Sequence, residues 1–491
     1  MRSLLLAVGL GAGPALVAAQ APVSARLSLA DAIAIARQNS PTYRAALNDR
    51  GPAGWAVRSA WSSLFLPSFT ASGGIGYAGP GEQNFLTSSF SQDVSTLSSF
   101  YDLGLSWQLS GATLSQPGLE KARQRATEAD IAGADNLLTT SVTEQYLTVL
   151  QAGENLELAR KTLERNEEFL KLARAQFAVG QRTLIDVRRA QVARGQADVA
   201  QLRAETVVSV EKLRLFERLG VVPPTDIAAV VLTDTFPVEQ PRWRLDELLA
   251  MAERENPSLN ALRARETAAD WGVRSATSSY GPTVSLSAGW SGFTQKFTDL
   301  DPIIRNSQAL FGAQYAQCND DNVIRQNAGL PPNDCSAYIW GSDNEQALRA
   351  ANATYPFDFT RQPFQARLGI TLPIFTNFSR QRTISETREQ RDDVTEAVRA
   401  RALGLRTDVS QAFLALDATY RAVAIQDTNR TAGAEQLQLA TDRYRVGSGT
   451  FFELIDAQVA ALRADFDYIA AVYDYHRAVT VLEAAVGRRL R

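Results

Sequence analysis

The chain has 491 residues, with 50 basic and 53 acidic side chains and a formal net charge of −3. This balance gives no electrostatic basis for nucleic-acid binding, which requires a surplus of basic residues. After the N-terminal segment, no stretch approaches the roughly 18 consecutive apolar residues of a membrane-spanning helix, so any membrane insertion must use strands.

The N-terminus has the pattern of a secretory signal peptide. A positive charge at Arg2 is followed by an apolar run from Leu4 to Val17 and by small residues up to Ala19. Because this segment is too short for a membrane span, we expect residues 1–19 to be a cleaved signal peptide and the mature chain to be exported. No cysteine follows the cleavage site, so no lipid anchor is expected there.

Two similar repeats follow, residues 20–220 and 244–491, joined by a proline-bearing linker at 221–243. The offset that brings Val142 onto Val409 aligns the chain with itself without a gap as far as Gly220 and Gly487. Each repeat opens with a short predicted helix and then a second one that starts at a proline, Pro41 or Pro257. A gapless self-match of this length indicates an internal duplication.

After these helices the apolar residues recur at every second position. Four such segments occur, at 69–77, 101–109, 284–290 and 364–372, and each sets apolar or small residues against Ser, Thr, Gly or Gln. Their length of about ten residues suits tilted transmembrane strands. Aromatic residues that suit the membrane interface lie near their ends: Tyr77, Tyr101, Trp107, Trp290 and Phe364. Alternation alone fits an ordinary half-buried sheet equally well. The signal peptide, the absence of a spanning helix and the uniform strand length favour a transmembrane β-barrel.

Four strands cannot close a barrel, because the smallest closed barrels have about eight. Open strand edges in lipid leave unpaired backbone groups, so the chain must oligomerise. Two copies would give about eight strands and three copies about twelve, and geometry alone does not choose. The loops at 78–98 and 294–362 are expected outside the cell, because the other strand ends run straight into helices.

A long helical hairpin is predicted in each repeat, with outgoing segments at about 118–177 and 379–444 and returning segments at 183–219 and 450–486. Apolar residues recur every seven positions along all four segments, with Arg430 as one interruption. The outgoing positions are Val142, Val149, Leu156, Leu163, Leu170 and Phe177, then Val409, Leu416, Val423, Leu437 and Tyr444; the returning ones are Ile185, Val192 and Val199, then Phe452, Val459, Phe466 and Tyr473. This spacing predicts left-handed coiled coils.

Signals for chemistry are weak. Cys318 and Cys335 lie in the 294–362 loop, and in an exported protein a disulfide is favoured over a metal pair, since the single histidine, His476, is distant in sequence. Gly74-x-Gly76-x-x-Gly79 matches a dinucleotide pattern but is followed by Pro80 instead of a helix. We expect no catalytic residue, no cofactor and no metal site, and therefore no enzyme.

The paired turns Phe177-Ala178-Val179-Gly180 and Tyr444-Arg445-Val446-Gly447, with the duplicated strand pairs, resemble the TolC-like outer-membrane efflux family over nearly the whole mature chain. The resemblance implies a mainly α-helical fold with a transmembrane β part. In the implied trimer a twelve-stranded barrel in the outer membrane of a Gram-negative bacterium continues into a periplasmic α-barrel. Such proteins are exit ducts for efflux or type I secretion that dock a periplasmic adaptor and an inner-membrane transporter. A periplasmic coiled-coil adaptor or structural protein is the alternative, and a free-standing porin is a third.

The resemblance also assigns residues. The tip turns that meet the adaptor in that family correspond to Phe177, Val179, Gly180, Tyr444, Val446 and Gly447, although each glycine can also simply close its helix. Glu453 and Asp456 correspond to an entrance ring of acids that would favour cations in a trimer, the plain alternative being solvated helix acids. Where the family has a latch arginine this chain has Gly449. Asp186, Tyr444 and Arg182 remain candidate latch residues, with a bond between Asp186 and Tyr444 as one arrangement. No motif identifies the cargo, and none gives a role for the basic C-terminal tail, Arg488 to Arg491.

Overall fold

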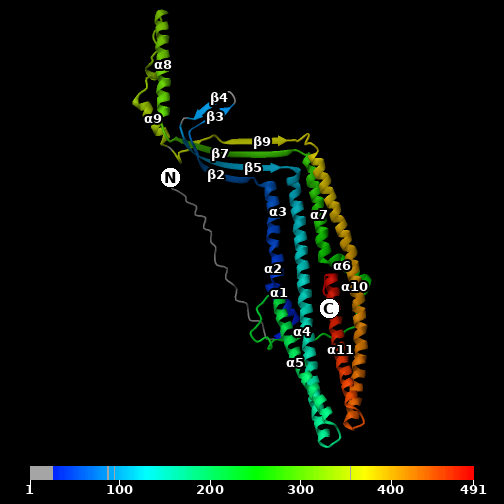
Figure 1. Cartoon of the computed structure of the whole chain (residues 1–491). Helices are drawn as coiled ribbons and strands as arrows, with labels where there is room; N and C mark the ends of the chain where they lie inside the picture. Colours follow the sequence, from blue (N-terminus) through cyan, green and yellow to red (C-terminus); the bar gives the residue numbers. More distant parts are fainter. Residues whose placement is uncertain (1–25, 86–87, 93, 354, 491) are drawn as a thin grey trace. The chain divides into compact units, whose positions relative to one another are not determined.

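The computed structural model describes residues 26–85, 88–92, 94–353 and 355–490 (Figure 1). The predicted signal peptide, residues 1–19, lies outside this range. Contacts divide the chain into a helical unit (Met1–Val57, Gly118–Asp270 and Arg388–Arg491) and a sheet unit (Arg58–Pro117 and Trp271–Thr387). Each unit takes segments from both predicted repeats, so the packing follows the type of secondary structure.

The sheet unit contains the four predicted strands in one antiparallel sheet. Its strands are β2 (Ser68–Ala78), β5 (Thr96–Leu109), β7 (Thr283–Phe297) and β9 (Gln365–Thr371), paired in that order, with the short β8 (Thr360–Arg361) also on β7. Strands β5 and β7 are longer than expected, because their ladder continues from Leu109 opposite Val284 to Thr96 opposite Phe297. Strands β2 and β9 form the two open edges.

The register brings the apolar positions of all four strands onto one face. Phe69 pairs with Leu105, Leu105 with Ala288, and Ala288 with Ala366. The neighbouring row consists of Ser68, Ser106, Ser287 and Arg367 on the opposite face. Phe69 is 65% and Leu368 is 68% exposed, and Leu103 and Leu286 are half-exposed, so the chain's own helices do not cover this apolar face.

Both long loops of the sheet unit contain secondary structure that the sequence did not predict. The first holds a separate hairpin of β3 (Gly81–Phe85) and β4 (Ser88–Gln92). The second holds α8 (Asp301–Asn327), a short 3-10 turn (Ser336–Tyr338) and α9 (Ser342–Asn352). These helices lie within the segment that the sequence analysis assigned as a long loop, 294–362.

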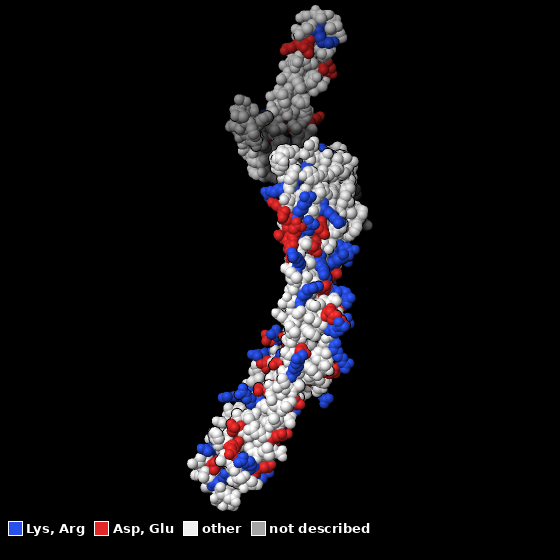
Figure 2. Space-filling view, turned by 90° about the vertical axis from the view of Figure 1, so that its right-hand side faces the viewer, with Lys and Arg blue, Asp and Glu red and all other residues white. Residues whose placement is uncertain are grey.

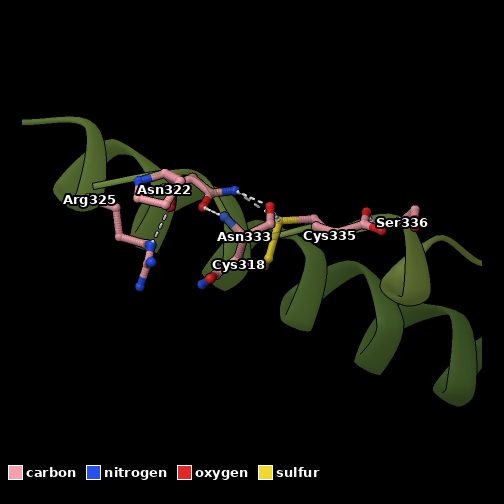
Figure 3. The surroundings of a disulfide bond; sticks show 8 residues. Cys318, Asn322, Arg325, Asn333, Cys335 and Ser336 are labelled. Carbon is pink, nitrogen blue, oxygen red and sulfur yellow. Dashed lines mark hydrogen bonds between the residues drawn. A yellow bond between two sulfur atoms is a disulfide. The ribbon is translucent and has the colours of Figure 1, made fainter. Parts of the chain in front are cut away.

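A disulfide joins Cys318 of α8 to Cys335 (Figure 3). Beside it, the side chain of Asn322 donates to the carbonyl oxygen of Asn333 at 2.9 Å and accepts from the backbone N–H of Asn333 at 2.6 Å. Arg325 donates to the Pro331 carbonyl oxygen at 2.8 Å. The segment after α8 is therefore held back against the helix by a covalent bond and by hydrogen bonds.

The helices of the first repeat are α1 (Leu29–Asn39), α2 (Pro41–Asn48), α3 (Arg50–Phe65), α4 (Gly111–Ala178) and α5 (Leu184–Leu219). Those of the second are α6 (Leu245–Glu255), α7 (Pro257–Thr277), followed by a 3-10 turn (Ser278–Tyr280), α10 (Ser379–Arg445) and α11 (Phe451–Val486). Helix α4 starts before the expected Gly118 and continues through Pro117. In the described part of the chain, no helix has an apolar stretch sufficient to cross a membrane.

The hairpins are held by contacts between their outgoing and returning helices. Arg194 of α5 pairs with Glu167 of α4 at 3.1 Å. In the second hairpin, Arg430 of α10 lies over the ring of Tyr468 on α11, with its guanidinium carbon 4.1 Å from the ring centroid. Arg430, which interrupts the seven-residue pattern, is thus accommodated by a cation–π contact between the helices.

The seven-residue pattern is buried mainly on the outgoing helices, although Phe177 at the end of the first one is exposed. Val142, Val149, Val409, Leu416 and Tyr444 are buried. On the returning helices the seven-spaced positions are exposed apart from the half-buried Tyr473, and the hairpin cores take other residues instead: Val187, Ala190 and Ala197 of α5, and Leu454, Ala457 and Ala461 of α11. The seven-residue spacing therefore identified the outgoing cores but not the core faces of the returning helices.

The predicted linker packs on the helical unit. A two-residue strand β1 (Arg26–Leu27) pairs in parallel with β6 (Val231–Leu232). The hydroxyl of the buried Tyr146 lies 2.8 Å from a carboxylate oxygen of Asp234, and Tyr475 donates to the Glu239 carbonyl oxygen at 2.6 Å. A ring nitrogen of His476 lies 3.0 Å from the carbonyl oxygen of Phe236. The single histidine is thus part of a packed structural contact.

Candidate functional site: the hairpin tips

The two tip turns have the same backbone design. Gly180 has a φ of +73° and Gly447 a φ of +86°, in the left-handed region that glycine adopts without strain. In the first turn the N–H of Gln181 donates to the Gln176 carbonyl oxygen at 2.9 Å, a helix-closing bond. A Cβ on either glycine would meet no atom within 4 Å, so the glycines are required for the backbone angle and not for space.

The valines that precede these glycines are presented to solvent. Val179 is 69% and Val446 is 78% exposed, and Phe177 is also exposed. Exposed apolar side chains on a tight, well-defined turn are suited to contact another protein. The same turns therefore close the helices and display apolar side chains, which fits both readings of the sequence.

The recurring carboxylates after each turn form helix caps. Thr183 and Asp186 form a capping box at the start of α5, and Thr450 and Glu453 form one at the start of α11. The Asp186 carboxylate accepts from the Thr183 hydroxyl at 2.9 Å and from the Thr183 backbone N–H at 3.3 Å. Both bonds go to the same carboxylate oxygen, Oδ2. The Tyr444 hydroxyl has no hydrogen-bond partner among the described residues, so the bond considered between Asp186 and Tyr444 is not formed.

Arg182 connects the first tip to the second. Its Nη2 donates to the carbonyl oxygens of Tyr444 at 3.1 Å and Gly449 at 2.9 Å. Its guanidinium carbon lies 4.4 Å from the centroid of the Tyr444 ring. Nearby, Gln176 donates to the Arg445 carbonyl oxygen at 3.2 Å. We call the contacts of Arg182 with Tyr444 and Gly449 the Arg182 clamp.

Tyr444 is fully buried beneath this clamp, with its ring edge-on to Phe451 at 5.9 Å between centroids. Its hydroxyl has no hydrogen-bond partner among the residues that the structure describes. Burial raises the pKa of this hydroxyl, the positive charge of Arg182 opposes that rise, and the negative charge of Asp186 adds to it. Tyr444, which the resemblance groups with the tip residues, has its side chain in the core of the hairpins.

The two predicted entrance acids have different surroundings. Glu453 caps α11 and also lies 3.8 Å from Arg443. Asp456 is exposed one turn further along. Acidic and basic side chains are interspersed over the helical part of the face in Figure 2. The described ranges contain no group of three or more His, Cys, Asp or Glu side chains that could hold a metal ion.

Sequence reasoning named Arg182 as a candidate but not its contacts. The one sequence feature that pointed to a changed contact was Gly449, which stands where the resemblance predicts an arginine. Gln176 was missed altogether, because it is one of many glutamines on a polar helix. Contacts between repeats are set by packing and leave no periodic pattern.

Comparison with known proteins identifies the family of the chain. A family model described as "Outer membrane efflux protein" matches residues 32–221 and 340–488. The outer membrane protein TolC of Vibrio cholerae is 25% identical over 275 residues, covering 54% of this chain and 58% of that protein. The matched part thus spans less than two thirds of this curated relative.

Solved structures share the fold. The Campylobacter jejuni CmeC outer membrane channel has a TM-score of 0.67 at 14% identity, covering 94% of this chain and 85% of that chain. The Neisseria gonorrhoeae MtrE outer membrane channel in its open state has a TM-score of 0.66 at 19% identity, covering 94% and 89%. At these sequence identities the similarity shows a shared fold only.

Proposed function

Since this chain belongs to the outer membrane efflux protein family, we propose that it works as a homotrimeric exit duct. It passively conducts cargo from a periplasmic adaptor and an inner-membrane transporter to the exterior, in efflux or type I secretion. Family membership places the chain in the outer membrane and among transport proteins, not enzymes. The trimeric state, the adaptor and transporter partners, and the closed entrance are our proposals.

The observation that carries the proposal is the unfinished sheet. Strands β2 and β9 are open edges, and the apolar face around Phe69 and Leu368 is exposed. In lipid each unpaired backbone group costs several kcal/mol, on the order of tens for a whole edge. Pairing of β9 with β2 of the next copy keeps the antiparallel order and removes both edges. Three copies give about twelve strands, the number that the family resemblance implies.

Helices α5 and α10 of the helical unit each leave an apolar stripe uncovered. Helix α5 exposes its seven-spaced stripe of Ile185, Val192 and Val199. Helix α10 exposes a second apolar stripe, formed by Leu403, Leu414, Ile425 and Leu439. Apolar stripes of this length on soluble helices normally contact another helix. We assign them to the interface between copies, so that both units are completed by the same assembly.

The opposite, polar face of the sheet would line the pore. One of its rows consists of Ser68, Ser106, Ser287 and Arg367, the next contains Thr70, Gly104 and Gly289, and a third contains Ser72, Asp102 and Ser291. Hydroxyls and glycines offer hydrogen bonds and space, and Arg367 and Asp102 add one charge of each sign to this face. Such a lining suits a duct that leaves the choice of cargo to its transporter.

The tips of the two helical hairpins would dock the adaptor through Phe177, Val179, Gly180, Val446 and Gly447. The Arg182 clamp would hold the second hairpin against the first and keep the entrance closed. Glu453 and Asp456 of three copies would give the entrance negative charge and favour cations.

Membrane fractionation tests the proposal. The full chain should be found in the outer membrane as an oligomer that resists SDS until heated, and the purified oligomer should form pores in planar bilayers. A monomer in the soluble periplasmic fraction would reject the duct and favour a periplasmic adaptor.

A further inference from the structure

A cavity of about 370 Å³ lies between the linker and α11 in the helical unit. Much of its wall is aromatic, formed by Phe236 and Trp243 of the linker and by Tyr475 and His476 of α11. The rings of Tyr475 and His476 meet edge to face, with their centroids 5.0 Å apart. Clefts that hold small molecules have this kind of lining and begin at about 300 Å³. We call this cavity the linker pocket.

Trp243 is incompletely packed. It also lines a second cavity of about 220 Å³, whose other walls include Phe413 and Tyr420 of α10. Protein interiors normally leave few voids larger than a water molecule, so a tryptophan that borders two cavities lacks contacts that a ligand can supply. Trp243 is half-buried, and part of its surface remains open to solvent. The indole ring is therefore available to an aromatic molecule in the linker pocket.

Hydrogen bonds hold the backbone of the linker pocket in place. The hydroxyl of Tyr475 donates to the Glu239 carbonyl oxygen at 2.6 Å, and a ring nitrogen of His476 lies 3.0 Å from the Phe236 carbonyl oxygen. Both α11 side chains are buried, so the linker is anchored to a well-packed part of the helix. A pocket that is formed before its ligand arrives spares that ligand the cost of ordering the chain.

Two side chains of opposite charge line the linker pocket without a charged partner. They are Glu239 and Arg242, and both are exposed. Among the residues that the structure describes, neither forms an ion pair, either with the other or with a third residue. A carboxylate and a guanidinium at one aromatic pocket match a ligand that carries both charges.

We propose that the linker pocket binds a small planar aromatic molecule that carries both an ammonium group and a carboxylate, the chemistry of a free aromatic amino acid. Its ring packs against Trp243 and Phe236. Its carboxylate pairs with the guanidinium of Arg242, and its ammonium group pairs with the carboxylate of Glu239. An aromatic acid without the ammonium group meets the like charge of Glu239, and an aromatic amine without the carboxylate meets that of Arg242. The site requires neither an adaptor nor a transporter and is separate from the proposed duct.

Isothermal titration calorimetry on the purified full-length protein tests the site with four probes. They are tryptophan, indole-3-propionate, which lacks the ammonium group, tryptamine, which lacks the carboxylate, and leucine, which lacks the ring. Tryptophan should bind, both indole analogues should bind about fivefold or more weakly, and leucine should show no binding at about 1 mM. Trp243→Ala should lose tryptophan binding, and Trp243→Phe should retain part of it.

Two further variants assign the charges. Arg242→Gln should remove the preference for tryptophan over tryptamine, and Glu239→Gln should remove the preference for tryptophan over indole-3-propionate. Because both side chains are exposed, these variants should fold even if Trp243→Ala does not. The control Arg244→Gln/Glu247→Gln neutralises one base and one acid that do not line the pocket, and it should leave all affinities unchanged.

Three results would overturn the inference. They are the absence of tryptophan binding at about 1 mM, equal affinities for the three indole compounds, and equal effects of the pocket variants and the control. None of these results depends on whether the protein forms pores, so the proposed function is tested separately by bilayer recording.

Discussion

Arg182 and Gly449 are equivalent positions of the two repeats, and Nη2 of Arg182 donates a 2.9 Å hydrogen bond to the carbonyl oxygen of Gly449. A Cβ at Gly449 would lie 3.1 Å from both the Cβ of Arg443 and the backbone nitrogen of Tyr444. The second tip thus has little room for a side chain at this position. The arginine of the first repeat supplies the cationic contact that the second repeat lacks.

Removing the Arg182 clamp should open the entrance. Arg182→Ala deletes two charge-assisted hydrogen bonds and one cation–π contact, which together contribute about 1–3 kcal/mol at a half-exposed site. The population of the closed state relative to the open state should fall by about fivefold to about 150-fold, since 1.4 kcal/mol is a factor of ten. Single-channel recording in planar bilayers should show a higher conductance, and Arg182→Lys should be intermediate. Arg174→Ala on α4 is the matched control, and equal traces for both alanine variants would reject the clamp.

Asp186 should prove to be a capping residue and not a latch. Asp186→Ala removes half of the capping box at the start of α5 and should cost about 1 kcal/mol of stability, as should Thr183→Ala. Conductance should stay at the wild-type value in both variants. Denaturant unfolding and bilayer recording on the same preparations separate the two roles. A large conductance change in Asp186→Ala alone would restore the latch.

The Tyr444 hydroxyl should make the fold sensitive to alkaline pH. Burial raises its pKa above the ordinary value of 10.0, so above about pH 10 the unfolded chain loses this proton before the folded one. Stability therefore falls as the pH rises through this range. Tyr444→Phe should be at least as stable as wild type at pH 8 and should lose less stability between about pH 9 and 11. Unfolding midpoints at several pH values check this; parallel curves for the two proteins would contradict it.

The disulfide should stabilise the insertion locally. Cys318 and Cys335 enclose a sequence separation of 17 residues, and a loop of this size corresponds to about 3 kcal/mol in the chain-entropy account. The double variant C318S/C335S should be cut by protease within the 301–352 segment much faster than wild type. Because that segment lies outside the strands, the amount of oligomer should stay the same. Protection equal to wild type would show that the hydrogen bonds around Asn322 suffice.

Features with a strict period could be predicted from the sequence. The four strands follow from alternation, and the pairing of Phe69 with Leu105 confirms that the alternating faces are joined. The helix ends at Gly180 and Gly447 follow from the need for a left-handed residue. In each case one local physical rule fixes the structure.

Features without a buried face could not be predicted. Helix α8 has only Ile304 and Cys318 buried, so its sequence carries no apolar period to read. The exposed stripe of Ile185 and Val192 has a clear period, but a seven-residue spacing does not say whether a helix of the same chain or of another molecule covers it. The Arg182 clamp joins two repeats through backbone carbonyls, which have no sequence signature.

The most direct test is covalent trapping of the edge strands between copies. Ala71→Cys on β2 is combined in turn with Ala366→Cys, Leu368→Cys or Ile370→Cys on β9, and membranes are oxidised before SDS electrophoresis. At least one pair should give a ladder that ends at three copies, whereas Leu103→Cys on the interior strand β5, paired with the same β9 positions, should give none. A chain that remains at the mass of one copy with every edge pair would contradict the shared barrel and, with it, the duct.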